Sequence, residues 1–240
     1  MTNNQIIQQQ LYEGASHFKI DLTPAQSDQF VRYFEELQAW NQKFNLTRII
    51  EPSEVVSKHF LDSLTLYPLL TDSASLIDVG SGAGFPGIPL KIVMPQLRVT
   101  LLESTGKKCT FLDHLVETLN LEQLTVVKGR AENAGQHSDY RQRYHVATAR
   151  AVARLSTLAE YLLPFVKVGG SMMALKGQDP TSELDEARRA IGILGGKSPH
   201  IDRVTIPGLD APRHVVRVLK QKQTPKRYPR RSGTPKKEPL

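Results

Sequence analysis

One glycine-rich stretch, Asp78-Val79-Gly80-Ser81-Gly82-Ala83-Gly84, sets the architecture expected of this chain. The apolar run at 76–79 is typical of a short buried strand, and a helix is expected after the glycines. Glycines in such a turn adopt positive φ angles and let a ligand approach the backbone, while the start of the helix offers unpaired N–H groups. The stretch therefore predicts a strand, a ligand-binding turn and a helix.

The spacing of these glycines distinguishes between ligands. A dinucleotide-binding fingerprint, G-x-G-x-x-G, needs a glycine at position 85, where Phe85 stands. The pattern here is G-x-G-x-G after an acidic residue, and Glu103 follows about 20 residues further on, at the end of the next expected strand. A carboxylate at that place can accept hydrogen bonds from both ribose hydroxyls, and it disfavours a ribose that carries a 2′-phosphate.

Further strands are expected at 99–102, 124–127, 145–149 and 172–175, with helices between them. We expect one helix to end near Gly169-Gly170. Strands that alternate with helices predict an α/β fold with a mostly parallel, doubly wound sheet. The last two apolar runs, 204–206 and 215–219, are joined by a turn too short for a crossover helix, so we expect this final pair to be antiparallel.

Three regions are expected along the chain. Residues 1–72 form an N-terminal helical region packed on the core, residues 73–219 the sheet domain, and residues 220–240 a basic, Pro-rich C-terminal tail. Thr23 and Gln26, with Pro24 between them, form a capping box that begins one helix, and a second helix is expected after Pro52.

The tail carries all the excess positive charge of a chain whose formal net charge is +7. Its one acidic residue is Glu238, and its basic residues are Lys220, Lys222, Lys226, Arg227, Arg230, Arg231, Lys236 and Lys237. The prolines predict a segment that is extended and solvated when free. Such a tail suits a polyanion, and we expect RNA, with a solvated terminus as the alternative.

Other features narrow the class of protein. The N-terminus lacks the basic start and apolar run of a signal peptide, and no apolar run approaches the roughly 18 residues that span a bilayer. Cys109 is the single cysteine, so disulfides within the chain are excluded. We therefore expect a cytoplasmic protein with no membrane partner.

Several motifs together resemble one family. The Asp-x-Gly-x-Gly-x-Gly turn with Glu103 is similar to motifs one and two of S-adenosylmethionine-dependent methyltransferases with a Rossmann-like sheet. The motifs that narrow the resemblance are Trp40-Asn41, Phe44 to Thr47, His59 to Leu64, Phe85-Pro86-Gly87, Gly129 to Glu132, Ala149-Arg150-Ala151, Arg227 to Arg231 and Gly233 to Lys237. In combination they resemble RsmG (GidB), the bacterial small-subunit (16S) rRNA guanine-N7 methyltransferases.

The resemblance implies a fold, a cofactor and a substrate. The fold is a Rossmann-like class I methyltransferase sheet with a final antiparallel strand pair and an N-terminal helical extension, and the cofactor is S-adenosyl-L-methionine. The substrate is N7 of a guanosine in 16S rRNA, met free or in the small ribosomal subunit. Cofactor contacts are expected at Gly80, Gly82, Phe85, Glu103, Ala131, Glu132 and Arg150. RNA contacts are expected from the tail at Lys226, Arg227, Arg230, Arg231, Lys236 and Lys237.

No catalytic acid or base is assigned. Guanine N7 has an in-plane lone pair and no proton, so its methylation depends on orientation and on exclusion of water. Cys109 is expected to be a packed residue, which disfavours methylation at pyrimidine carbon 5. The fourth strand lacks the Asn/Asp-Pro-Pro-aromatic turn that serves exocyclic amino groups.

Two other functions remain open. An NAD-dependent oxidoreductase would share the turn and Glu103, although Phe85 counts against it, and a non-catalytic RNA-binding protein would explain the tail alone. His59 and Asp62 lie one helical turn apart, but we expect no metal because further ligands at suitable spacing are missing. We expect a monomer, with His59 and Asp62 near the mouth of the site.

Overall fold

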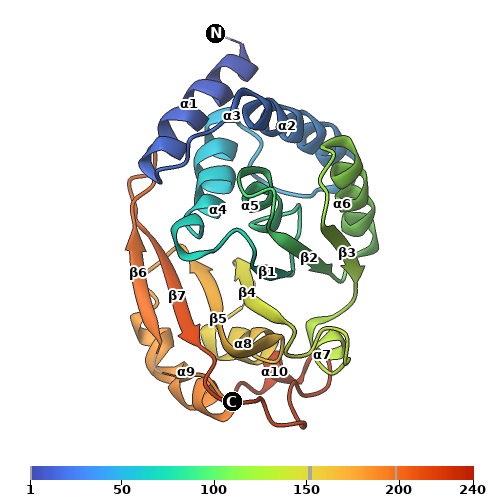
Figure 1. Ribbon diagram of the computed structural model, residues 1–240, viewed down its shortest axis with the longest axis vertical. Helices are drawn as coiled ribbons and strands as arrows, with labels where there is room; N and C mark the ends of the chain where they lie inside the picture. The colour runs from blue at the N-terminus through green and yellow to red at the C-terminus, as the bar shows by residue number, and fades with distance from the viewer. Residues whose placement is uncertain (1, 151–152, 198) are drawn as a thin grey trace.

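The structure, a computed structural model, describes residues 2–150, 153–197 and 199–240; Ala151 of the motif around Arg150 lies outside them. A seven-stranded sheet crosses the middle of the molecule in the order β3-β2-β1-β4-β5-β7-β6 (Figure 1). The strands are β1 (Ser75–Val79), β2 (Arg98–Glu103), β3 (Leu124–Lys128), β4 (Tyr144–Arg150), β5 (Val166–Lys176), β6 (His200–Val204) and β7 (Arg213–Leu219).

The first five strands are parallel, and β7 runs antiparallel to both β5 and β6. The expected α/β sheet with an antiparallel final pair is therefore confirmed. The strand order turns outward in both directions from β1 and β4, so a crevice is expected at the carboxyl ends of these two strands. The glycine-rich turn leaves β1 at this point.

Helices cover both faces of the sheet, as Figure 1 shows. On one face lie α1 (Asn3–His17), α2 (Pro24–Phe44), α3 (Pro52–Val55), α4 (Asp62–Leu64), α5 (Gly87–Val93) and α6 (Gly106–Thr118). On the other lie α7 (Ala131–Ala134), α8 (Leu155–Leu162), α9 (Thr181–Ile193) and α10 (Thr234–Lys237). Successive strand residues supply the two cores: Leu76 and Leu101 pack into the first, while Ile77 and Leu102 pack into the second.

The N-terminal helices share the first core with the sheet. Phe30, Phe34 and Leu37 of α2 are buried in it together with Leu76 of β1. The expected capping box is present, because Thr23 Oγ1 accepts from the Gln26 N–H and Gln26 Oε1 accepts from the Thr23 N–H. The helix expected after Pro52 is interrupted by a π-helical segment, η1 (Val56–Leu61), which joins α3 to α4, and a short 3-10 turn, η2 (Tyr67–Leu69), leads to β1.

Two boundaries differ from the expectation. The helix before β5 ends at Leu162, and Gly169-Gly170 lie inside β5, because the strand begins at Val166 beside Tyr144 of β4. The edge strand β6 spans His200–Val204 and not 204–206, because its antiparallel register pairs Val204 with Arg213, at the beginning of β7. Ile206 lies beyond the strand and packs in the first core.

The prediction of a solvated tail is wrong for much of the segment. Lys220, Thr224, Tyr228 and Pro235 are buried, and Tyr228 belongs to the second core. Arg141 holds the chain here by donating to the carbonyl oxygens of Thr224 and Tyr228 at 2.8 and 2.7 Å. The tail packs because Tyr228 enters the second core and its backbone carbonyls accept from Arg141. These partners are far away in the chain, so the composition of the tail does not reveal them.

Candidate functional site

The glycine-rich turn is held against the end of β1 by Asp78. This carboxylate is fully buried, and its Oδ2 accepts from the Gly87 N–H at 2.9 Å. Burial raises its pKa to about 7, against the lowering effect of the bond from Gly87. Within the described residues Asp78 Oδ1 has no hydrogen-bond partner.

Positive φ angles at three glycines shape the turn. Gly80, Gly82 and Gly84 have φ values of 75°, 62° and 102°. A Cβ atom on Gly84 would lie 2.7 Å from the Tyr33 hydroxyl oxygen, so glycine is also required there by the close approach of α2. Tyr33 in turn donates to the Ala83 carbonyl at 2.6 Å.

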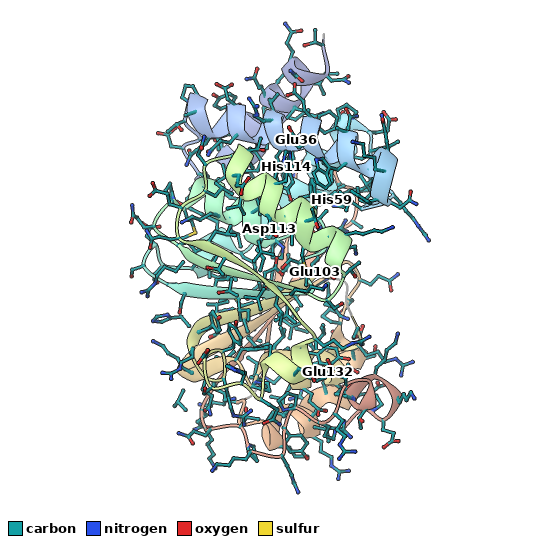
Figure 2. The ribbon with its side chains drawn as sticks, turned by 90° about the vertical axis from the view of Figure 1, so that its right-hand side faces the viewer. Glu36, His59, Glu103, Asp113, His114 and Glu132 are labelled. Carbon is teal, nitrogen blue, oxygen red and sulfur yellow. The ribbon has the colours of Figure 1, made fainter. Side chains whose placement is uncertain are left out.

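Glu103 stands at the end of β2 beside this turn. It is buried, Oε2 accepts from the Gly82 N–H at 3.0 Å, and Oε1 accepts from the Thr105 N–H at 2.7 Å. The two backbone donors fix the carboxylate at the sheet edge. Figure 2 shows His59, Glu103 and Glu132 in this order from the top of the view downward.

A cavity of about 160 Å³ opens at the carboxyl ends of β1, β2 and β3. Its lining includes Gly80, Ala131, Glu132 and Tyr161. Glu132 is buried, and its Oε1 accepts from the backbone N–H of Gly233 at 2.8 Å. Exposed backbone at the edge of a sheet can bind a nucleoside, and the Glu132 carboxylate can accept a hydrogen bond from an amino group on its base.

Phe85 and Arg150 meet on the other side of the turn. Phe85 stacks on His59 with 4.5 Å between ring centroids, and the Arg150 guanidinium lies 4.8 Å from the Phe85 ring centroid. Arg150 also donates to the Lys58 carbonyl at 2.9 Å and to Asp62 Oδ2 at 3.1 Å. The π-helical segment η1 and α4 thus hold the end of β4.

His59 is held in its neutral form in this cluster. Burial, followed by the charge of Arg150, lowers its pKa to about 3. Nδ1 lies 3.1 Å from both Arg150 Nη2 and the Lys58 carbonyl oxygen, and Nε2 lies 2.9 Å from Thr47 Oγ1, so both ring nitrogens have polar partners. A neutral imidazole next to an arginine adds no second positive charge.

A second cavity of about 280 Å³ lies beside this cluster, at the carboxyl ends of β4 and β5. Its lining includes Lys58, His59, Asp62, Arg150, Lys176 and Arg213. Arg213 donates to Asp62 Oδ1 at 3.0 Å, so Asp62 holds two arginines at once. The wall is rich in donors, and Phe85, which follows the glycine-rich turn, packs on His59 and Arg150 of this wall.

The expected cofactor residues therefore fall into two groups. Gly80, Ala131 and Glu132 line the first cavity, with Gly82 and Glu103 bonded to each other beside it. Phe85 and Arg150 lie at the cluster next to the second cavity. The glycine-rich turn lies between the two groups.

The residues expected to contact RNA differ in their exposure to solvent. Lys226, Arg227, Arg231, Lys236 and Lys237 are exposed. Arg230 instead pairs with the buried Glu160, with 2.7 Å between Nη2 and Oε2. Lys220 is buried, donates to the Leu163 and Leu194 carbonyls, and has a pKa lowered by burial to about 7.

Cys109 is packed inside the protein. Its side chain is 6% exposed, and burial raises the pKa of its thiol, with the charge of Glu103 as a further cause. It lines neither cavity. Within the described residues, no group of three or more His, Cys, Asp or Glu side chains is arranged to hold a metal ion.

Sequence reasoning missed four residues. Tyr161 lines the first cavity and Gly233 donates to Glu132 there, while Lys176 and Arg213 line the second cavity. Arg213 is the first residue of β7, so its place next to an expected strand could have indicated a role at the edge of the sheet. Gly233 is 101 residues from Glu132 in the chain, and no local pattern connects them.

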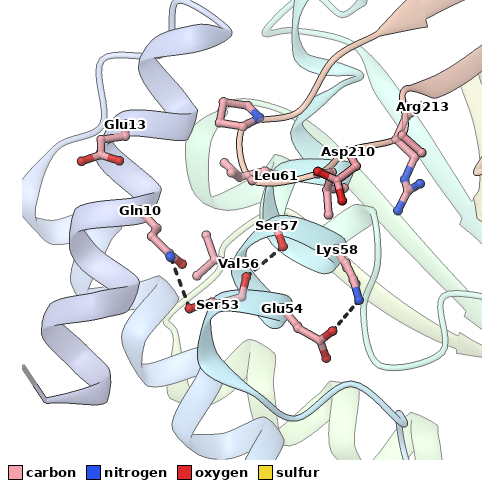
Figure 3. Close-up of a pocket in the computed structure, with 14 residues that line it drawn as sticks. Gln10, Glu13, Ser53, Glu54, Val56, Ser57, Lys58, Leu61, Asp210 and Arg213 are labelled. Atoms are coloured by element: carbon pink, nitrogen blue, oxygen red, sulfur yellow. Dashed lines mark hydrogen bonds and ion pairs between the residues drawn. The ribbon is translucent and has the colours of Figure 1, made fainter.

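The largest of these cavities, about 560 Å³, lies between α1, the segment from α3 to η1 and the loop before β7 (Figure 3). Lys58 pairs here with Glu54, and Gln10 donates to Ser53 Oγ at 3.2 Å. The two basic side chains in its lining, Lys58 and Arg213, are both paired with carboxylates of the protein, Glu54 and Asp62. We assign no ligand to this cavity.

The chain is similar to known proteins along most of its length. A family model described as rRNA small subunit methyltransferase G matches residues 26–215. The chain is 48% identical over 231 residues to the ribosomal RNA small subunit methyltransferase G of Acetivibrio thermocellus, covering 96% of this chain and 95% of that one. It is 48% identical over 226 residues to the protein of the same name from Lactococcus lactis subsp. cremoris, covering 93% and 94%.

Solved structures show the same fold at low identity. A SAM-dependent methyltransferase from Aquifex aeolicus superposes with a TM-score of 0.53 at 16% identity, covering 73% of this chain and 97% of the other. The precorrin-6y C5,15-methyltransferase of Geobacter metallireducens gives 0.50 at 16%, covering 67% and 88%. Across the described part of the chain, no helix is both long enough and apolar enough to span a membrane.

Proposed function

Because the chain belongs to the rRNA small subunit methyltransferase G family, we propose that it transfers the methyl group of S-adenosylmethionine to N7 of a guanosine in 16S rRNA. It is an S-adenosylmethionine-dependent methyltransferase of small-subunit rRNA. The choice of N7 as the methylated atom is part of this proposal. The observation that carries it is the glycine-rich turn with a donor-rich cavity beside it, in which His59 is neutral, the Asp62 carboxylate is engaged by two arginines, and none of the described lining residues is a cysteine.

The residues at the sheet edge fit the cofactor. The buried carboxylates of Glu103 and Glu132 stand at the ends of β2 and β3, where ribose hydroxyls and the adenine amino group need acceptors. The turn from Gly80 to Gly84 offers backbone rather than side chains to the middle of the ligand. We infer that Phe85 and Arg150 border its methionine end.

The second cavity is the proposed place of the target guanine. When bound, S-adenosylmethionine supplies an electrophilic sulfonium methyl group that the N7 lone pair attacks in line. Arg150 and Arg213, oriented by Asp62, present N–H donors to guanine O6 and to the RNA backbone. His59 stays neutral and packs on Phe85, which keeps water and further positive charge away from the reacting atoms.

Mapping of the modified nucleotide tests this function. Small-subunit rRNA lacking the modification is incubated with the protein and S-adenosylmethionine, reduced with borohydride and cleaved with aniline, which breaks the chain at N7-methylguanosine. We expect one cleavage site that depends on cofactor and protein. Methyl incorporation without cleavage would show another target atom, and NAD binding in place of S-adenosylmethionine binding would support the oxidoreductase alternative.

A further inference from the structure

The C-terminal segment that follows Pro229 is anchored at two places on α8. At the first, Glu160, 1% exposed, accepts from the Arg230 backbone N–H at 2.8 Å and from Arg230 Nη2 at 2.7 Å. At the second, Thr157 Oγ1 donates to the Pro235 carbonyl at 3.1 Å. A buried carboxylate requires a partner of this kind, so the first anchor holds the segment firmly.

Between the anchors the segment passes along α7. Gly233 has a φ of 88°, which turns its N–H toward Glu132, and Ser232 Oγ donates to Asn133 Oδ1 at 3.2 Å. The bond from Gly233 N to Glu132 Oε1 measures 2.8 Å. The anchors and the glycine thus bring one backbone donor to one buried acid.

Glu132 also faces the first cavity. It lines the cavity together with Tyr161 of α8, whose pKa is raised by burial first and then by the charge of Glu132. The carboxylate therefore stands between the C-terminal segment and the expected place of the adenine. Gly233 holds Oε1 of this carboxylate, so the bond limits how the Glu132 side chain can lie in the cavity wall.

We propose that residues 230–235 are a positioning part of the cofactor site, in which the Gly233 N–H orients Glu132 to accept a hydrogen bond from the adenine amino group. This rests on the proposed function, because it requires an adenosyl ligand in the first cavity. The tail then serves the cofactor as well as the RNA.

Two full-length variants test the proposal. Gly233→Val places a β-branched residue at a φ that such residues avoid, while a Cβ there would meet no atom within 4 Å, so only the backbone conformation is disturbed. Gly169→Val is the matched control, because Gly169 has a φ of 86°, is equally open and lies in β5. The second variant, Glu160→Gln with Arg230→Gln, removes the first ion pair without leaving a buried charge unpaired.

The readout is calorimetric binding of S-adenosylhomocysteine and of its inosyl counterpart, in which a carbonyl replaces the adenine amino group. We expect wild-type protein to prefer the adenosyl compound, because the Glu132 carboxylate accepts from an amino group and repels a carbonyl. Gly233→Val and the double variant should bind the adenosyl compound roughly three- to tenfold more weakly and discriminate less. Gly169→Val should keep wild-type affinity and discrimination.

Two results would overturn the inference: wild-type affinity and discrimination in both tail variants, or an equal loss for both compounds, which a general loss of structure would cause. Failure of the wild-type protein to bind S-adenosylhomocysteine would instead overturn the proposed function. Melting temperatures of Gly233→Val and Gly169→Val, measured in parallel, show whether the two substitutions strain the backbone comparably.

Discussion

The backbone N–H of Gly82 donates to Glu103 Oε2 across 3.0 Å, which joins the turn after β1 to the acid that ends β2. The two motifs recognised separately in the sequence are therefore one physical unit. Glu103 shapes the turn before any ligand arrives, and its second oxygen is held by Thr105. A substitution here affects both the ribose acceptor and the backbone that surrounds it.

Glu103→Ala should weaken binding of S-adenosylmethionine by roughly ten- to hundredfold, which corresponds to the loss of charge-assisted hydrogen bonds. Calorimetry on folded protein measures the effect, with Glu117→Ala on the exposed side of α6 as the control. Unchanged affinity would remove Glu103 from the cofactor site.

Because of Asp78, the free energy of unfolding should fall as the pH rises, whereas a carboxyl group with a lowered pKa has the opposite effect. The pKa of Asp78 is about 7 in the folded protein and near 3.8 when unfolded, so the folded state binds the additional proton between these values. Its contribution to stability is full below about pH 4 and is lost as the pH rises through 7. Compared with Asp78→Asn, the wild-type free energy of unfolding should therefore fall from pH 4 to pH 7, measured by denaturant titration.

The control for this prediction is Asp72→Asn, an exposed position before β1. The difference in unfolding free energy between the wild type and that variant should stay nearly flat over the same range. A flat difference for Asp78→Asn as well would contradict the raised pKa.

Cys109→Ala should keep the rate of methyl transfer close to that of the wild type, because a buried thiol with a raised pKa is not the nucleophile. The substitution should lower stability by about 1 kcal/mol, as removal of a small buried group does. Single-turnover kinetics provides the measurement. A folded, cofactor-binding variant without turnover would contradict direct attack by N7.

Replacing Lys226, Lys236 and Lys237 by glutamine should reduce the salt dependence of RNA binding, since all three are exposed and lie outside residues 230–235. Each lost phosphate contact on single-stranded RNA changes the slope of log K against log salt by about 0.7, or roughly two units for three contacts. Cofactor affinity should not change, because the anchor between Arg230 and Glu160 remains.

A matched charge control for the tail is the triple variant of Arg32, Arg189 and Lys197, which are exposed elsewhere on the protein. It lowers the net charge equally and should leave the slope nearly unchanged. Equal slopes for the two triple variants would show that net charge, and not the tail, governs RNA binding.

The sequence by itself determined the features that local physics dictates. Glycines at positive φ, a capping box at Thr23 and alternating apolar runs gave the sheet, the turn and the acid at Glu103, since each depends on residues close together in the chain. Only the tertiary structure decided which partners those residues meet. Arg150 is held by Asp62, 88 residues away, and Glu132 by Gly233, 101 residues away. Even the tail, which its composition marks as solvated, docks because Glu160 is buried and requires a cation, a demand that exists only once α8 has packed against the sheet.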